Sequence, residues 1–284
     1  MTDTIIAFVD GSIYSHSLCE YAAWIAKRGD AAIDLVHVLG PREAAAPSDY
    51  SGSIKLGART ALMQELASLD EQRAKLVAHR GRAILDDATA VIRDAGVEAV
   101  TPHLRHGEIA ETVGEQDLAA SLVLIGKRGE TAEKPDRALG QNLERIVRAS
   151  HRPVFVAARA FKPVERILVA WDGGPSAMRA VDFMARSPIF AGLSVRLVTI
   201  GHDTSEARRS LDDAAALLGA AGIKATTEVI AGQPAAVLGR IEEEEGFDLL
   251  VMGAYGHSRI RTMIVGSTTS EMIRTCHSPV LLVR

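Results

Sequence analysis

Residues 249–256 read Leu249-Leu250-Val251-Met252-Gly253-Ala254-Tyr255-Gly256, an apolar run that passes into a Gly-x-x-Gly loop. After nine more residues the chain continues Gly266-Ser267-Thr268 into a segment with apolar residues at helical spacing. The apolar run predicts a strand that is buried on both faces, as in a helix-covered parallel sheet. Glycines let backbone N–H groups approach phosphate oxygens, and Ser267 as helix N-cap would add a hydroxyl and the helix dipole. We therefore predict an anion-binding loop, with a plain tight turn and helix cap as the alternative.

The chain contains an internal repeat of this unit. Residues 5–11 match residues 167–173, since each is an apolar strand that ends in Asp-Gly; residues 122–129 match 249–256, and residues 151–156 match 277–282. Strand and helix patterns alternate through both copies. The fold class predicted is α/β: two doubly wound, five-stranded parallel-sheet domains, 1–160 and 164–284, related by pseudo-two-fold symmetry.

The first copy carries an insertion. The offset between matching positions falls from 162 residues at Asp10 and Asp172 to 126 at Pro153 and Pro279, which locates about 36 extra residues near 42–79. A Pro/Gly/Ser-rich stretch, 41–53, predicts a mobile loop. A long amphipathic helix should follow and continue to about residue 95, with its apolar positions packed in the core or between domains rather than on an external partner. These positions are Leu62, Leu66, Leu69, Leu76 and Ile84.

In an open parallel sheet, ligands bind beyond the carboxyl ends of the strands, where the strand order reverses. By fold analogy we expect the order 3-2-1-4-5 in each domain, which places that point between strands 1 and 4. Asp172 follows strand 1 and Gly253 ends strand 4. Asp172 is expected to contact the ribose or adenine of a nucleotide, although a turn role is the alternative. His257 is placed to reach a phosphate or to lie in solvent.

These residues resemble the universal stress protein family, in particular its tandem members, over nearly the whole chain except the insertion. The nucleotide-binding signature of that family, Gly-x-x-Gly, nine residues and Gly-Ser/Thr, matches Gly253, Gly256, Gly266 and Ser267, with Thr268 following. The resemblance further implies that the aspartate after strand 1, Asp172, contacts the nucleoside and that the backbone of Ile200 at the end of strand 2 holds the adenine. It implies ATP as the ligand, with Mg²⁺ or Mn²⁺ as an accompanying ion.

The first copy departs from this signature. Asp10, Val38, Gly126, Gly129 and Gly140 occupy the matching positions, but ten residues separate the last two glycines and Gln141 replaces the hydroxyl residue. Acidic side chains in that interval would repel a phosphate, an effect that Lys127, Arg128 and Arg137 would offset. The leading interpretation of this copy is structural support or a different small ligand, with ATP binding as the alternative.

Composition narrows the function classes. The net charge of −4 and the pI near 6.2 provide no basic field for nucleic acid or anionic lipid. No apolar run approaches the roughly 18 residues of a membrane helix. Two distant cysteines predict neither a disulfide framework nor a zinc site, and the default location is the cytoplasm. His103 and His106 lack further ligands at suitable spacing, so no metal site is expected. The acidic run 242–245 is interpreted as a solvated helix end.

Three function hypotheses follow. The first is an ATP-binding regulatory or stress-tolerance protein that acts through nucleotide occupancy of the second domain. The second is a weak ATPase or a nucleotidyl-handling enzyme, although no residues of the second copy match a dedicated water-activating set and no catalytic residue is assigned. The third is an interaction scaffold. The two domains are expected to pair edge to edge through 154–157 and 280–283, which leaves homodimerisation of the whole chain open. The loop hypothesis predicts that Gly253→Val abolishes ATP binding with little change in fold.

Overall fold

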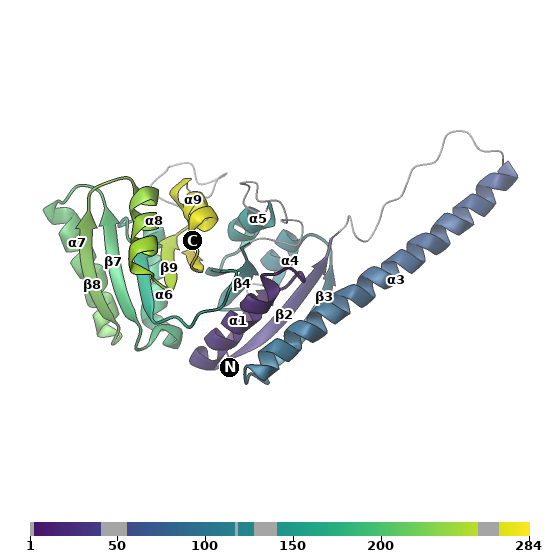
Figure 1. Ribbon diagram of the computed structural model, residues 1–284, viewed down its shortest axis with the longest axis horizontal. Coiled ribbons are helices and arrows are strands. Elements are labelled where there is room, and N and C mark those ends of the chain that lie inside the picture. The colour runs from purple at the N-terminus through teal and green to yellow at the C-terminus, as the bar shows by residue number, and fades with distance from the viewer. Residues whose placement is uncertain (1–2, 41–55, 117–118, 128–140, 255–266) are drawn as a thin grey trace.

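The computed structural model describes residues 3–40, 56–116, 119–127, 141–254 and 267–284 (Figure 1). Within these residues, ten strands form one sheet. The strands are β1 (Asp3–Phe8), β2 (Ala31–Leu39), β3 (Val100–His106), β4 (Leu122–Gly126), β5 (Val154–Ala157), β6 (Arg166–Ala170), β7 (Ser194–Ile200), β8 (Lys224–Ile230), β9 (Leu249–Gly253) and β10 (Val280–Val283). The helices are α1 (Ser15–Gly29), α3 (Leu56–Asp94), α4 (Ile109–Gln116), α5 (Gln141–Ala149), α6 (Pro175–Arg186), α7 (Ser205–Ala220), α8 (Pro234–Glu245) and α9 (Ser267–Thr275), with a short 3₁₀ turn at Pro188–Phe190.

The strand order is β3-β2-β1-β4-β5-β10-β9-β6-β7-β8. Each half of the sheet therefore has the predicted order 3-2-1-4-5, and its strands are parallel. The two halves join where β5 and β10 pair antiparallel, with Phe155 opposite Leu281. The fold prediction is confirmed, including the pairing through the two apolar edge strands.

Alternating side chains of the strands build a core on each face of the sheet, because successive residues of a strand point to opposite faces. Ile5, Ala7 and Val9 of the first copy pack in one cluster, whereas Ile6 and Phe8 pack in the other. Helices α1, α3, α6 and α7 cover the first face, and α4, α5, α8 and α9 cover the second. Both clusters contain residues of both halves, so the core is continuous across the seam.

An aromatic cluster holds the chain between the two halves. Tyr21 of α1 packs against Phe155 with ring centroids 5.2 Å apart and against Phe161 at 4.9 Å. Its hydroxyl donates a hydrogen bond to the Ala160 carbonyl at 3.3 Å. Ser17 of the same helix donates to the Ala158 carbonyl at 2.6 Å. Helix α1 of the first half thus holds the segment that leads into the second.

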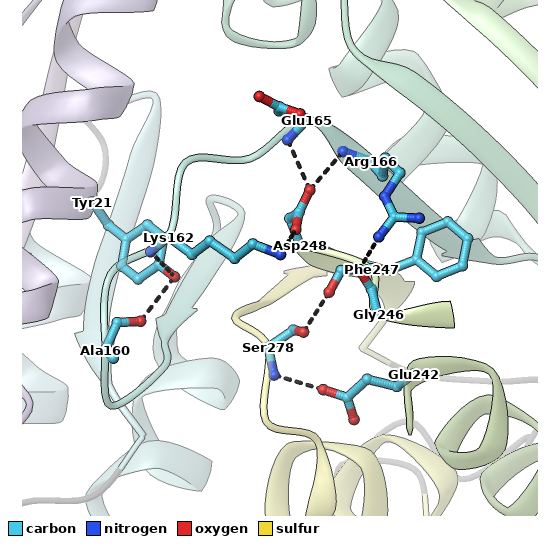
Figure 2. A network of polar contacts seen from close by, with 10 residues as sticks. All are labelled: Tyr21, Ala160, Lys162, Glu165, Arg166, Glu242, Gly246, Phe247, Asp248 and Ser278. Carbon is cyan, nitrogen blue, oxygen red and sulfur yellow. Dashed lines mark hydrogen bonds and ion pairs between the residues drawn. The ribbon is translucent and has the colours of Figure 1, made fainter. Parts of the chain in front are cut away.

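A buried carboxylate, that of Asp248, holds the inter-domain segment against the second half of the chain (Figure 2). Asp248 precedes β9, and its side chain is 4% exposed. One oxygen pairs with Lys162 Nζ at 2.6 Å, and the other accepts hydrogen bonds from the peptide N–H groups of Glu165 and Arg166 at 3.1 and 2.9 Å. Burial alone would raise the pKa of Asp248, but Lys162 and these two N–H groups bring it below its usual value. The ion pair links the inter-domain segment to the second half of the sheet.

Helix α3 extends far beyond the sheet that it covers (Figure 1). Its C-terminal part packs closely: a Cβ at Gly81 would lie 2.7 Å from Leu104 Cδ1 and 3.0 Å from His37 Cδ2. The predicted helix is confirmed, but the predicted burial of its apolar positions is wrong for Leu69 and Leu76, which are 54% and 71% exposed. Only Ile84 of the described positions packs against the core. At 3.6 residues per turn, Ile84 lies roughly 80° around the helix from Leu76, so the two belong to different faces.

Candidate functional site

The candidate site lies at the carboxyl ends of β6, β7 and β9. Strand β6 lies between β7 and β9, with Ala170 opposite Val198 on one side and Met252 on the other. The chain turns away after β6 at Asp172, β7 ends at Ile200 and β9 ends at Gly253. This is the point at which the strand order reverses, so the fold brings together three residues that the sequence predicted as site residues.

Asp172 forms a turn at the start of α6. Its Oδ1 accepts a hydrogen bond from the Gly174 N–H at 2.9 Å, and the intervening Gly173 has φ of +68°. The side chain is exposed at the carboxyl end of β6. The turn role that the sequence left as an alternative is therefore real, and it holds the carboxylate in a fixed orientation beside β6.

Ile200 turns its peptide groups toward β6. The N–H and C=O groups of successive strand residues point to alternate sides. The Val198 carbonyl accepts from the Trp171 N–H on the β6 side at 2.9 Å, and the Gly201 N–H donates to Ile230 on the β8 side at 2.9 Å. The N–H and C=O of Ile200 therefore face the β6 side, at a level where the β6 chain has already turned away. Such a donor and acceptor pair matches the edge of an adenine ring.

Gly253 lies in close contact with the first turn of α6, so packing alone limits this position to glycine. A Cβ at this position would lie 2.9 Å from Ser176 Cβ, 3.1 Å from Ala177 N and 3.3 Å from Ser176 C. Two of these atoms belong to the backbone of the first turn of α6, which no side-chain rotation can move. The close packing of β9 on α6 thus requires glycine here. The prediction that Gly253→Val would leave the fold little changed is wrong, because valine would force these elements apart.

The first turn of α9 is tied to the end of β9. Thr269 is buried, and its hydroxyl donates a hydrogen bond to the Gly253 carbonyl at 3.2 Å. On the other side of Gly253, the Ala254 N–H donates to the Val283 carbonyl at 2.8 Å. The helix start therefore lies next to the strand end, where its dipole can act on an anion. Sequence reasoning missed Thr269, since the signature directed attention to the two residues before it.

Several predicted residues lie outside the described ranges. These are Gly256, His257, Gly266, Gly129 and Gly140, together with Arg128, Arg137 and the 41–53 stretch. Ser267 was predicted as the N-cap of its helix, and α9 begins at Ser267 itself, a difference of one residue that is usual at helix ends. Thr268 lies in the first turn and is partly buried.

The first domain presents a different environment at the matching strand ends. Asp10 Oδ1 accepts from the Ser12 N–H at 2.9 Å and from the Ser15 hydroxyl at 3.2 Å. A Cβ at Gly11 would lie 2.9 Å from Ile84 Cδ1, whereas the matching Gly173 faces the Ser210 hydroxyl at 3.3 Å. An apolar side chain of α3 thus covers a loop that is flanked by a polar group in the second domain.

Lys127 and Val38 are two further residues of the first domain that the sequence singled out. Lys127 follows β4, and its ammonium group donates to the Cys276 carbonyl beyond the C-terminal end of α9. It therefore contacts the second domain. Val38, the counterpart of Ile200, is partly buried at the matching place in β2.

A cavity of about 350 Å³ lies at the seam between the halves, away from these strand ends. It is lined by Tyr21 of α1, by residues of the inter-domain segment such as Lys162, and by residues that precede β9 and β10, such as Phe247 and His277. The residues that precede β9 and β10 lie at the amino ends of these strands. The cavity therefore does not coincide with the predicted nucleotide site.

Side chains weighed as metal ligands or acids have structural partners. His103 Nε2 lies 3.3 Å from Asp34 Oδ1. Glu242 Oε1 accepts from the N–H groups of His277 and Ser278, each at 2.6 Å, so the acidic run is more than a solvated helix end. In the part of the chain that the structure describes, no three His, Cys, Asp or Glu side chains gather as a metal site, and no helix is long and apolar enough to cross a membrane.

Comparison with known proteins gives the family. The sequence matches the model of the universal stress protein family over residues 1–158 and 194–284. It is 33% identical to a universal stress protein of Synechocystis sp. over 284 residues, which cover 99% of each chain.

One solved structure agrees at the level of the fold. A universal stress protein from Archaeoglobus fulgidus superposes with a TM-score of 0.71 at 20% identity, covering 100% of this chain and 99% of that one. A universal stress protein solved in complex with cAMP is 27% identical and covers 43% of this chain, with a TM-score of 0.37. The family match over most of the sequence and the full-length relative together establish that this chain belongs to the universal stress protein family.

Proposed function

We propose that the second domain binds ATP at the carboxyl ends of β6, β7 and β9, and that nucleotide occupancy of this site gives the protein a regulatory role in stress tolerance. The observation that carries the proposal is that Asp172, Ile200 and the first turn of α9 lie together where the strand order reverses. The hydrogen bond from Thr269 to the Gly253 carbonyl holds the start of α9 there. Each supplies a different part of a nucleotide-binding surface.

The nucleotide would be held from its base to its phosphates along this edge. The peptide groups of Ile200 suit the adenine ring, and the exposed Asp172 carboxylate suits a ribose hydroxyl, to which it can only accept hydrogen bonds. The N-terminal turn of α9 offers peptide N–H groups and a positive dipole end to the phosphates. An accompanying Mg²⁺ or Mn²⁺ ion would bind mainly through phosphate oxygens, as Mg²⁺ does at many nucleotide sites.

The first domain is proposed to support the second rather than to bind ATP. Ile84 covers its Gly11 loop, Asp10 is engaged by two hydrogen bonds, and Lys127 is directed to the second domain. These contacts leave the matching strand ends less suited to a polar ligand. Binding at one site per chain follows from this difference.

The test uses a matched pair of charge-removing variants. Asp172→Asn keeps a side-chain oxygen for the turn to Gly174 but removes the carboxylate charge, and Asp10→Asn makes the same change in the first domain. We expect Asp172→Asn to weaken ATP binding at least ~10-fold, about 1.4 kcal/mol, with the fold kept. Asp10→Asn should bind ATP as the unmodified chain does. Isothermal titration calorimetry measures both.

Equal effects of the two variants would contradict the assignment to the second domain, and no effect of Asp172→Asn would remove this residue from the site. The same samples test the enzyme alternative when they are assayed for released phosphate. Steady turnover of ATP that is lost in Asp172→Asn would favour a weak ATPase over a binding switch. An unmodified chain that binds no ATP would favour the scaffold alternative.

A further inference from the structure

The second domain holds helix α9 at both of its ends. At the N-terminal end, the Thr269 hydroxyl donates a hydrogen bond to the Gly253 carbonyl. Just beyond the C-terminal end, Ser278 donates its N–H to Glu242 of α8 and its hydroxyl to the Phe247 carbonyl, each at 2.6 Å (Figure 2). The nine residues of α9 make only about two and a half turns, roughly 14 Å. So short a helix moves as one body, and contacts at its C-terminal end also fix the place of its N-terminal end.

The first domain adds a contact at the C-terminal end of α9. Lys127, which follows β4, donates a hydrogen bond from its ammonium group to the Cys276 carbonyl. Cys276 comes directly after the last residue of α9, where the helix itself offers no donors to the final carbonyl groups. Hydrogen bonds from a charged donor are roughly twice as strong as neutral ones, and a cation at this end also favours the helix dipole. Lys127 is therefore a C-terminal cap of α9 that comes from the other domain.

The second domain makes a corresponding contact with the first, but from a different position. Arg284, which follows β10, donates to the Arg148 carbonyl at 2.7 Å, near the C-terminal end of α5. Helix α5 is the counterpart of α9 in the repeat. The repeat matches Lys127 with Ala254, a buried residue without a charge. Of the two contacts, the one from Lys127 is made to the helix of the proposed ATP site.

Lys127 lies at the opposite end of α9 from the proposed phosphate position. It can therefore act on a nucleotide only through the position and the dipole of the helix. The proposed adenine and ribose contacts, Ile200 and Asp172, belong to β7 and to the turn before α6. A change at Lys127 should thus affect the phosphates of a bound nucleotide more than its nucleoside part.

We propose that Lys127 is a positioning residue of the nucleotide site in the second domain. From the first domain, it holds the C-terminal end of α9 so that the N-terminal end is correctly placed for the phosphates. This inference rests on the proposed ATP binding. It gives the first domain a role at the site that requires no ligand of its own. Because coupling free energies are reciprocal, bound ATP should in turn strengthen the contact between the domains.

The test compares ATP binding by three variants of the full chain in isothermal titration calorimetry. Lys127→Gln removes the cation and should weaken ATP binding about 5-fold or more, as is typical of coupled sites, with an unchanged far-UV circular dichroism spectrum. Lys127→Arg keeps a cation and should restore most of the affinity. Arg284→Gln is the matched control, because it removes the cation at α5 and leaves the Arg284 carbonyl, which accepts from Arg179, in place. This control should bind ATP as the unmodified chain does.

Adenosine separates positioning of the phosphates from a general loosening of the site. It has the base and the ribose of ATP but no phosphate, so its binding should not depend on where α9 begins. Lys127→Gln should therefore bind adenosine as the unmodified chain does. A purely structural role of Lys127 would weaken adenosine and ATP equally.

Four results would overturn the inference while leaving ATP binding itself intact. They are full ATP affinity in Lys127→Gln, equal losses for ATP and adenosine, equal effects of Lys127→Gln and Arg284→Gln, and no recovery of affinity in Lys127→Arg. A Lys127→Gln chain that does not fold would also overturn it, because Lys127 would then be required by the fold. An unmodified chain that binds no ATP would contradict the proposed function and the inference together.

Discussion

Gly253→Ala is expected to destabilise the protein whether or not nucleotide is present. The added methyl carbon would lie 2.9 Å from Ser176 Cβ and 3.1 Å from the backbone nitrogen of Ala177. Relief requires β9 and the start of α6 to separate by several tenths of an ångström. Overpacking of this kind typically costs about 1–3 kcal/mol, and for a chain of this size each kcal/mol corresponds to a fall in Tm of roughly 2–4 °C.

Gly239→Ala provides the control for this prediction. Gly239 lies inside α8, and a Cβ there would meet nothing within 4 Å. The change should raise stability by about 0.5–1 kcal/mol, because alanine loses less entropy than glycine in a helix. Thermal unfolding of nucleotide-free protein measures both variants. An unchanged Tm for Gly253→Ala together with lost ATP binding would refute the packing argument and return Gly253 to a direct role at the ligand.

Three further predictions follow from single contacts. Asp248→Asn should lower the free energy of unfolding by about 1–3 kcal/mol at pH 7. Because the folded pKa of Asp248 lies below the unfolded value of 3.8, its stabilising effect is present above that pH and is lost as the pH falls through the folded pKa. Urea titrations should therefore separate the two chains at pH 7 and bring them together under strong acid; equal stability at pH 7 would contradict the role of the ion pair. Burial raises the pKa of the Cys19 and Cys276 thiols to about 12, with a smaller contribution from the charge of Glu20 for Cys19 and of Glu242 for Cys276. A thiol reagent at pH 8 should therefore label neither cysteine until the protein unfolds. Fast labelling of the native chain would disprove this burial. Thr269→Val should weaken ATP binding by about 0.5–1.5 kcal/mol, since α9 loses its hydrogen bond to the Gly253 carbonyl. Thr269→Ser keeps the hydroxyl and should bind ATP as the unmodified chain does in the same titration. Weakened binding by the serine variant would show that the methyl group of Thr269 matters instead.

Much of the fold could be predicted because strand patterns are local and repeat within the chain. The Asp-Gly ends of residues 5–11 and 167–173 identified the first strand of each half. The order 3-2-1-4-5 was expected by fold analogy rather than from the sequence pattern, and each half of the sheet has it. The apolar edge strands also indicated the antiparallel pairing of β5 with β10. These features depend on hydrophobic periodicity, which the sequence displays directly.

The remaining errors concern contacts between distant segments. The sequence shows that Gly253 is a glycine, but its close approach to Ser176 and Ala177 depends on how α6 lies against β9. Likewise, Lys127 was expected to offset the repulsion between a phosphate and the acidic side chains of its own loop, although it contacts the Cys276 carbonyl of the other domain. The apolar positions of the insertion were treated as one stripe, and the structure divides them between two faces of α3.

The most direct measurement is the number of ATP molecules bound by one unmodified chain, obtained by isothermal titration calorimetry of the full-length protein. The proposed account predicts one molecule per chain, bound by the second domain. Two molecules per chain would show that the first domain binds ATP despite Ile84 and Gln141. A titration with no binding would contradict the proposed function itself.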